Sequence, residues 1–471
     1  MESMNPGADA LALLPEILML TGAITALLTG SFVPRERQWI SRIIALGALA
    51  ASATAAAAAV DGTATSAYSG SYTIDAGTGA GRLVVAVSAL LVIVLGTNEL
   101  RATERESETY TLILLASLGA TVLTGAADLL VLIAGFLLAS IPLYALIGIG
   151  RTKNGAEAAL KTYLQGAFFG ILLMLGVAVL YAAAGTTSYA GLRSGLEHAA
   201  GALTGVGLVG VLAGLMFKAG AVPAHFWVPD AAEGAGTAAA AFATTVPKIG
   251  GILAAYRLLG QMPGTVAWPL LVALLAAVTM TLGNLAAFGQ KNPRRLLGWS
   301  TVSQAGYLLM PLAVAGAVPL ALPSVLVYLA GYAASNLTAF AIIGAYPDRA
   351  ELRGYEGLST ARPWHAVALV VALLSLVGTP PTGVFLGKLA VFTAAWDGGF
   401  WWLAALAALN TVASLFYYLR WLAPAFRAAS PDSPGAGDFI PRAWPARAAT
   451  TGAFLTLAVG IGGGLVWTTL S

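Results

Sequence analysis

The sequence predicts an all-α membrane protein that crosses the bilayer about fourteen times. Of its 471 residues, 58% are hydrophobic and only 10% are charged, which is more apolar surface than a soluble core can hide. Runs of about 20 apolar residues recur, each long enough for a helix to cross a hydrocarbon core about 30 Å thick. Strands of a membrane barrel would instead show alternating segments of about 10 residues. The chain has no cysteine, which excludes disulfides, iron–sulfur ligation and thiol chemistry within it.

The predicted spans are separated mostly by short connections. They lie near 8–30, 39–60, 80–98, 109–126, 128–149, 159–184, 201–221, 236–257, 264–288, 296–317, 321–345, 364–395, 399–423 and 447–468. The first span is expected to persist in the mature protein, because no basic segment or cleavage site of a removable signal is apparent. The longer connections 61–80 and 428–445 are rich in Gly, Ser, Thr or Pro and are predicted to be surface loops.

Basic residues gather in alternate connections, and this pattern predicts the orientation of the chain. Lys and Arg follow the first, third, fifth, ninth, eleventh and thirteenth spans, whereas Arg82, Arg193 and Arg257 lie toward the other face. Because cytoplasmic loops carry the excess of Lys and Arg, both termini are predicted on the non-cytoplasmic side. The alanine-rich composition, with more arginine than lysine, fits a high-GC bacterium and so a bacterial cell membrane. The basic residues are dispersed rather than clustered. The lipid bilayer is therefore an expected partner of the chain, and a nucleic acid is not.

Three of the six lysines, Lys218, Lys248 and Lys388, fall within apolar spans. Lysine at the centre of a membrane helix costs about 2.5–3.5 kcal/mol, and ionisable groups at that depth normally mark an ion or proton path. Removal from water favours the neutral amine, so a buried lysine can exchange its proton near physiological pH. Snorkelling toward an interface is an alternative for any single lysine. The three together predict a proton relay.

Two of these lysines lie next to a proline that interrupts the helix. The seventh span ends in FKAGAVPAHFWVPD at residues 217–230, and the twelfth contains GTPPTGVFLGK at residues 378–388. Interrupted spans in corresponding places point to repeats around a transport site. Spans four to eight and nine to thirteen form two blocks of five, and an odd number of spans inverts the second block, so Lys218 corresponds to Lys388. Lys248, on the next antiparallel span after Lys218, is expected to connect the two halves.

His225 follows the end of the seventh span and is a weaker candidate for the same path. A histidine titrates near neutral pH, but a lone one after a helix end can equally serve as a capping or packing residue. Both interpretations stay open. His198 and His365 lie near span ends and are expected to be incidental.

Several stretches resemble signature segments of a known family. The segments FKAGAVPAHFWVPDAAEGAG, PKIGG, QKNPRRLLGWSTVSQAGYLL and GTPPTGVFLGK are similar to those of the antiporter-like membrane subunits of respiratory complex I. Over nearly the whole chain, further stretches resemble the N-type subunits of that family. These are LLPE at 13–16, EAALKTY at 157–163, Tyr332 with Asn336, and the stretch from Asn410 to Arg420.

The resemblance implies a proton-translocating subunit of an NADH-quinone oxidoreductase, a translocase whose redox chemistry takes place in other subunits. No cofactor or metal is expected in this chain, whereas NADH, FMN, iron–sulfur clusters and quinone are expected in partner membrane and redox subunits. The implied parts are an N-terminal three-helix segment at 1–108, antiporter-like repeats at 109–257 and 264–423, and a C-terminal loop and last helix at 424–471.

Motif positions assign roles to individual residues. By resemblance, Lys218, Lys248 and Lys388 form the relay, and His225 and Gln304 are accessory. Gln304 stands where related subunits often have histidine. A glutamine cannot titrate, although it can order water.

One departure from the family pattern concerns the charge partner of Lys218. The fifth span of related subunits usually carries a glutamate three residues before a Ser-x-Pro-Leu-Tyr segment, and here Leu137 occupies that position. Asp128 is nine residues earlier, about 13 Å along a helix at 1.5 Å per residue, which is too far to replace it. Without the opposite charge, desolvation favours neutral Lys218.

Three functions therefore remain open. The chain can be a pumping subunit in which Lys218 works from a more neutral resting state, and residual pumping is favoured. It can instead be a structural subunit of the same complex that does not pump. The third alternative is a subunit of a multi-subunit cation/proton antiporter, against which the N-type start and end of the chain argue.

Overall fold

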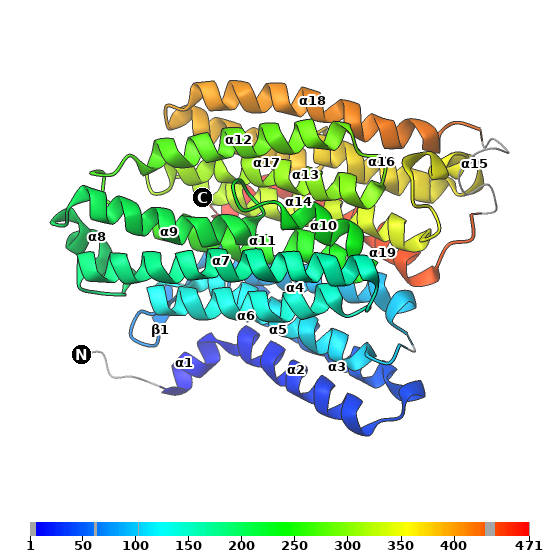
Figure 1. Cartoon of the computed structure of the whole chain (residues 1–471), viewed down its shortest axis with the longest axis horizontal. Coiled ribbons are helices and arrows are strands. Elements are labelled where there is room, and N and C mark those ends of the chain that lie inside the picture. The colour runs from blue at the N-terminus through cyan, green and yellow to red at the C-terminus, as the bar shows by residue number, and fades with distance from the viewer. Residues whose placement is uncertain (1–5, 61–63, 102, 429–438, 471) are drawn as a thin grey trace.

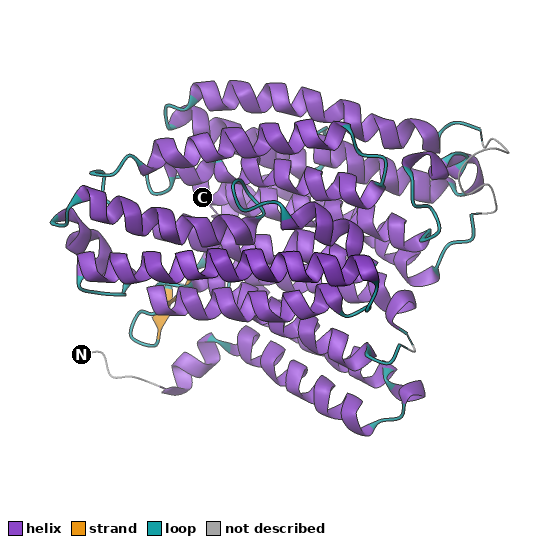
Figure 2. Ribbon diagram, viewed as in Figure 1, coloured by secondary structure: helices purple, strands orange, loops and turns teal. Residues whose placement is uncertain are grey.

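The computed structural model describes residues 6–60, 64–101, 103–428 and 439–470. Helices that run roughly side by side make up nearly all of this part of the chain (Figures 1 and 2). Helices α2 (Leu14–Phe32) and α3 (Trp39–Ala58) lie at one edge of the array, and α18 (Trp401–Ala425) lies at the other (Figure 1). The predicted all-α membrane fold is confirmed.

The elements follow one another in three groups. The N-terminal group contains α1 (Pro6–Ala12), α2, the 3-10 helix η1 (Arg35–Arg37), α3, β1 (Thr65–Ala67), β2 (Tyr72–Ile74) and α4 (Ala76–Leu100). The next contains α5 (Glu106–Gly125), α6 (Leu129–Gly148), α7 (Lys153–Ala184), α8 (Tyr189–Glu197), α9 (Gly201–Ala219), α10 (Trp227–Gly234) and α11 (Thr237–Leu259). The last contains α12 (Trp268–Phe288), α13 (Pro293–Leu309), η2 (Pro311–Val314), α14 (Ala321–Ala345), η3 (Leu352–Tyr355), α15 (Leu358–Ala361), α16 (Pro363–Val377), α17 (Gly383–Asp397), α18 and α19 (Ala443–Leu470).

Within the described residues, 11 helices are long and apolar enough to cross a membrane. They account for all but three of the predicted spans. Those three, at 296–317, 364–395 and 447–468, coincide with α13, with α16 and α17 together, and with α19. The count of fourteen therefore stays a prediction.

Both predicted helix breaks are present. Helix α9 ends at Ala219, where Gly220 adopts φ 70°, and α16 ends at Val377, where Gly378 adopts φ 96°. Glycine reaches this left-handed conformation without the steric cost that a side chain brings, and it commonly terminates helices. Helices α10 and α17 resume the chain beyond the two gaps.

The centre of the molecule is formed by α11 and α14, whose apolar stretches are almost wholly buried. Helix α14 packs against α4, α11, α16, α17 and α19, which come from all three groups of elements. Because every face of these two helices is covered by protein, their polar side chains have only each other and the neighbouring helices as partners.

The loop predicted at 61–80 is only partly correct. Residues 61–63 lie outside the described part of the chain, as do residues 429–438 of the loop predicted at 428–445. In the rest of 61–80, β1 and β2 pair antiparallel with Thr65 opposite Ile74, and α4 begins at Ala76. The hairpin is anchored by Tyr72, whose hydroxyl proton is shared between two acceptors, Glu16 Oε1 at 2.9 Å and the Thr121 carbonyl oxygen at 3.0 Å. Strands of three residues are too short to show an alternating pattern.

A buried ion pair joins α2 to α4. Arg82 donates from Nε to Glu16 Oε1 at 2.7 Å and from Nη2 to Oε2 at 2.8 Å, and both side chains are buried. Such a two-point contact fixes the geometry of both partners. Arg82, predicted only to face the non-cytoplasmic side, thus holds the outer helix α2 against the core.

Replacing one member of this pair should destabilise the fold. Glu16→Gln leaves the guanidinium of Arg82 buried without an opposite charge, which costs about 3–5 kcal/mol. We expect a clearly lower melting temperature of the purified protein in detergent. The exposed pair Arg193–Glu197 provides the control, because Glu197→Gln should change stability by less than about 1 kcal/mol. Equal effects of the two substitutions would contradict a structural role for the buried pair.

Candidate functional site

Lys218 is the penultimate residue of α9 and is buried. Its Nζ donates a hydrogen bond to Ser140 Oγ of α6, and it lies 4.8 Å from the ring centroid of Phe136 and 6.0 Å from that of Phe217. A cation over an aromatic face is stabilised by about 0.5–2 kcal/mol, more when it is desolvated. Hydroxyl and ring contacts therefore surround this ammonium group.

Lys248 lies in the middle of α11, one residue after Pro247. Its Nζ donates to the carbonyl of Thr301 in α13 at 2.5 Å and lies 4.9 Å from the ring centroid of Tyr332 in α14. The Tyr332 hydroxyl is 2.9 Å from Thr301 Oγ1 and donates to the Thr244 carbonyl at 2.7 Å. The lysine is thus held between the two central helices and α13.

Lys388 lies in α17, beyond the second break, and reaches back to the helix before it. Its Nζ donates to the Val377 carbonyl at 2.8 Å and to Thr411 Oγ1 at 3.2 Å, and it lies 4.1 Å from the ring centroid of Tyr307. The last carbonyls of a helix have no partner within that helix. The break at Gly378 therefore provides the acceptor that Lys388 uses.

All three lysines share one kind of environment. Each has an uncharged oxygen as hydrogen-bond acceptor and an aromatic ring beside its Nζ, and none forms an ion pair with a carboxylate in the described part of the chain. A nearby carboxylate would favour the charged amine strongly, whereas neutral partners favour it only modestly. This environment suits a group that gains and loses a proton.

One face of α13 lies between Lys248 and Lys388. Ser300, Gln304 and Tyr307 are spaced by four and three residues, which puts them on the same side of a helix. Gln304 Nε2 donates to the Leu376 carbonyl at 2.9 Å, directly beside the carbonyl that accepts from Lys388, and Tyr328 donates to Gln304 Oε1 at 2.5 Å. Thr411 Oγ1 lies 3.2 Å from the hydroxyl of Tyr307. Polar groups of α13 therefore lie beside Lys248, at Thr301, and beside the acceptors of Lys388, at Gln304 and Tyr307.

His225 lies in the gap between α9 and α10 and is buried. Its ring is 4.1 Å from that of Phe226 and 5.7 Å from that of Trp299, centroid to centroid. Neither ring nitrogen has a hydrogen-bond partner in the described residues. The packing and proton-path interpretations of His225 therefore both remain, because the ring is packed and its nitrogens are free.

Sequence comparison places the chain in a family. The family described as NADH:quinone oxidoreductase/Mrp antiporter, transmembrane region, matches residues 126–414, more than half of the chain. The chain is 52% identical to NADH-quinone oxidoreductase subunit N of Mycobacterium sp. (strain JLS), over 99% of this chain and 98% of the relative. It is 49% identical to subunit N 1 of Streptomyces griseus subsp. griseus, over 98% of each.

The chain belongs to the NADH-quinone oxidoreductase subunit N family. A solved structure agrees with this assignment. A chain of respiratory complex I from Thermus thermophilus with bound aureothin is similar with a TM-score of 0.83 and 30% identity, covering 97% of this chain and 99% of that one. The resemblance predicted from the motifs is confirmed.

In this subunit N family member, Leu137 occupies the position of the expected glutamate, and it lies beside the face of α6 that contacts Lys218. Phe136 and Ser140 of α6 face Lys218, whereas Leu137 is 37% exposed and Ile141 is 62% exposed. Asp128 caps the start of α6, accepting from Leu130 N and from Thr187 Oγ1, each at 2.7 Å. Asp128 is thus occupied at the helix end, in keeping with its predicted distance from Lys218.

Several residues of the site were not predicted as functional. Thr301, Tyr307, Tyr328, Thr411 and Tyr418 contact the lysines or Gln304, and Tyr418 also lies beside Ser300. The sequence feature that could have identified some of them is their helical spacing. Tyr328, Tyr332 and Asn336 recur every four residues in α14, so polar side chains line one face of an otherwise apolar helix. Thr411 and Val377 give no such signal, because their contacts join different helices.

A glycine of α11 leaves room for the stem of Lys218. A Cβ atom at Gly251 would lie 2.9 Å from Lys218 Cγ and 3.0 Å from its Cβ. These atoms are close to the backbone and cannot swing away freely. Lys218 can therefore lie against α11 only while residue 251 has no side chain.

Gly251→Ala should displace Lys218 without changing any ionisable group. Overpacking of a close contact costs about 1–3 kcal/mol, so we expect the protein to assemble but to translocate protons more slowly in reconstituted vesicles. Gly205→Ala, where the added Cβ would meet no atom within 4 Å, is the control. Normal proton uptake by an assembled Gly251→Ala variant would show that the position of Lys218 is unimportant.

Proposed function

We propose that this chain is a proton-translocating membrane subunit of a bacterial NADH-quinone oxidoreductase in which Lys218, Lys248 and Lys388 form the proton relay. Family membership supports the subunit assignment. The observation that carries the relay is the shared environment of the three lysines, which are buried and bonded to neutral oxygens. His225 and Gln304 are accessory groups in this proposal.

The contacts around α13 support a path between the two later lysines. Lys248 donates to the backbone carbonyl of Thr301, whose hydroxyl lies 2.9 Å from that of Tyr332, and Tyr328 donates to Gln304, three residues further along α13. In this proposal protons move past these polar groups toward Lys388. Gln304 cannot titrate, so its part is to hold hydroxyl groups and water in line.

Lys218 is the first relay member despite the leucine at position 137. Ser140 and the faces of Phe136 and Phe217 supply part of the stabilisation that a carboxylate would give. This environment favours a working relay over the alternative of a purely structural subunit. The other alternative, a cation/proton antiporter subunit, is disfavoured by the 52% identity to a subunit N across 99% of the chain.

Cofactors and orientation complete the proposal. NADH, FMN, iron–sulfur clusters and quinone are bound by partner subunits, and this chain contributes only proton movement.

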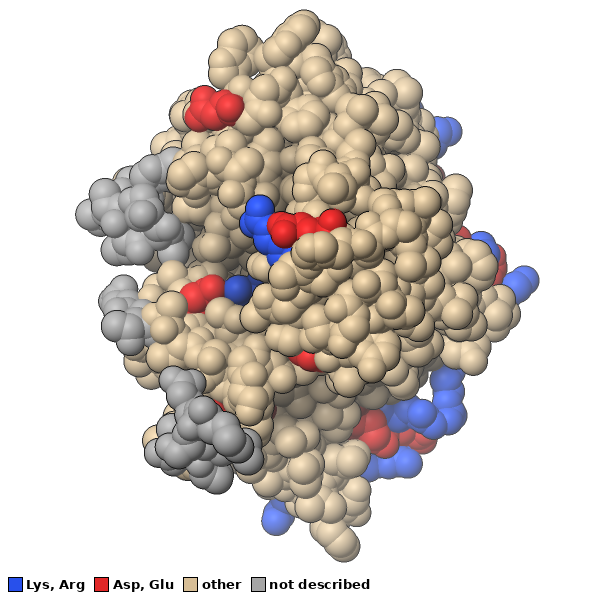
Figure 3. Space-filling view, turned by 90° about the vertical axis from the view of Figure 1, so that its left-hand side faces the viewer, with Lys and Arg blue, Asp and Glu red and all other residues tan. Residues whose placement is uncertain are grey.

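Both termini face the non-cytoplasmic side. Figure 3 shows few charged side chains on the end of the molecule that lies at the left of Figure 1, near the N-terminus and α8. A scarcity of Lys and Arg supports the non-cytoplasmic location of that end.

Lys388→Ala should abolish or strongly reduce proton uptake driven by quinone reduction in membrane vesicles. The alanine leaves no group at this position of the relay that can carry a proton. Lys153→Ala, which removes an exposed lysine at the start of α7, should leave proton uptake unchanged. Both complexes are first checked for full subunit content. Undiminished pumping by an assembled Lys388→Ala complex would contradict the proposed relay.

Leu137→Glu tests the missing charge partner. A glutamate at this position of α6 can turn toward Lys218 and favour its charged form. We expect an altered proton-to-electron ratio or an altered pH dependence of pumping, whereas Leu137→Gln, of equal size but without charge, should change neither. Identical behaviour of the glutamate and glutamine variants would mean that the departure at position 137 has no functional consequence.

A further inference from the structure

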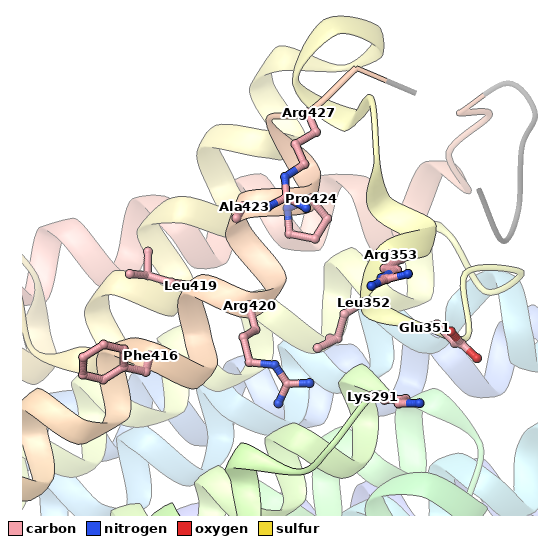
Figure 4. Close-up of a pocket in the computed structure, with 10 residues that line it drawn as sticks. All are labelled: Lys291, Glu351, Leu352, Arg353, Phe416, Leu419, Arg420, Ala423, Pro424 and Arg427. Carbon is pink, nitrogen blue, oxygen red and sulfur yellow. The ribbon is translucent and has the colours of Figure 1, made fainter. Parts of the chain in front are cut away.

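We propose that a basic pocket at the end of α18, together with the apolar groove that leads away from it, binds one anionic phospholipid. The basic pocket has a volume of about 520 Å³ and is lined by Lys291, Arg353, Arg420, Arg427 and Glu351, among others. Figure 4 shows that these charged side chains come from three separate segments: α18, the η3 region and the connection between α12 and α13. The pocket lies apart from the relay lysines.

The pocket has an excess of positive charge. Four basic side chains face one carboxylate, Glu351. Arg420 donates to the Phe288 carbonyl at the end of α12, but in the described part of the chain no carboxylate forms an ion pair with any of the four basic side chains. An anion placed here would be drawn by three net charges, and guanidinium groups bind phosphate oxygens in a two-point geometry.

The walls of the pocket are fixed by the backbone. Leu352 N donates to the Lys291 carbonyl at 3.0 Å, and Gly357 N donates to the Arg427 carbonyl at 2.9 Å. These two bonds tie the η3 region to the α12–α13 connection on one side and to the end of α18 on the other. The basic side chains therefore converge from a built framework and not from independent loops.

An apolar surface runs from the pocket along α18. Leu409, Val412, Phe416 and Leu419 are spaced by three or four residues and are between 42% and 69% exposed. Beside them, a groove of about 580 Å³ between α12 and α18 is lined by Val278, Leu282, Leu285 and Leu406, with others. From Leu406 to Arg420 the helix extends about 21 Å, which exceeds half of a hydrocarbon core of about 30 Å.

The charged pocket and the apolar groove together favour a ligand that is anionic at one end and apolar at the other. A free phosphate ion would use the pocket alone and leave the groove without a role. A phospholipid with a net negative charge places its phosphate among the basic groups and its acyl chain in the α12–α18 groove. Basic pockets between membrane helices on the cytoplasmic side bind anionic lipid head groups in this manner.

Photochemical crosslinking from inside the pocket identifies its occupant. Phe416→p-benzoylphenylalanine is placed in the chain within its assembled complex, which is reconstituted in nanodiscs of phosphatidylcholine containing a minor share of phosphatidylglycerol. After irradiation, the mass of the adduct on this chain is measured. We expect phosphatidylglycerol adducts several-fold above their share of the bilayer, and no change on adding excess inorganic phosphate.

Two triple variants separate this site from general surface charge. Lys291→Gln with Arg353→Gln and Arg427→Gln should return the adducts to the bulk lipid ratio. Arg37→Gln with Arg101→Gln and Lys153→Gln removes the same charge from exposed positions outside the pocket and should keep the enrichment.

Four results would overturn the proposal. The first is that lipid adducts form at the bulk ratio when the pocket cations are intact, and the second is that enrichment persists after the three pocket cations are removed. The third is that the adducts contain another protein subunit, and the fourth is that inorganic phosphate displaces the lipid. The third would assign the surface to a protein partner, and the fourth would make it a site for a free anion.

Discussion

The constraint on which the structure depends is that three amino groups lie in an apolar interior with uncharged partners. Each ammonium group needs acceptors there, because an unpaired buried charge costs several kcal/mol. Ser140, the Thr301 carbonyl and the Val377 carbonyl meet that need, and at least one aromatic ring lies beside each lysine. Such partners support the charged form without locking it. The same contacts thus explain how the lysines are tolerated, and the proposed proton exchange rests on them.

One of the two helix breaks serves this constraint. An intact helix uses its own carbonyls, whereas the end of α16 leaves Leu376 and Val377 free to accept from Gln304 and Lys388. The two breaks are not used alike: Lys218 lies before its break, and Lys388 lies after its own. Lys248 lies between them on α11, the most deeply buried of the membrane helices. The surrounding helices, joined by contacts such as that of Arg82 with Glu16, bury this core.

Features that depend on short stretches of sequence could be predicted, whereas contacts between distant segments could not. Apolar runs gave the membrane helices, Gly378 and its neighbouring prolines gave a break, and lysines in apolar segments gave the relay candidates. The pairing of Arg82 with Glu16, 66 residues away, has no local signal. The same holds for the contact of Lys388 with Thr411. The tyrosines of α13 and α14 are an intermediate case, because their helical spacing is visible but their partners are not.

The proton-to-electron ratio of a complex carrying Lys248→Met tests the relay most directly. Methionine fills a similar volume but holds no proton, and Lys248 is the only one of the three lysines that lies between the two broken helices. Quinone reduction and proton uptake are measured together in liposomes, with Lys153→Met as the control. A relay through Lys248 predicts a lower ratio in the assembled Lys248→Met complex and an unchanged ratio in the control. An unchanged ratio in both would contradict it.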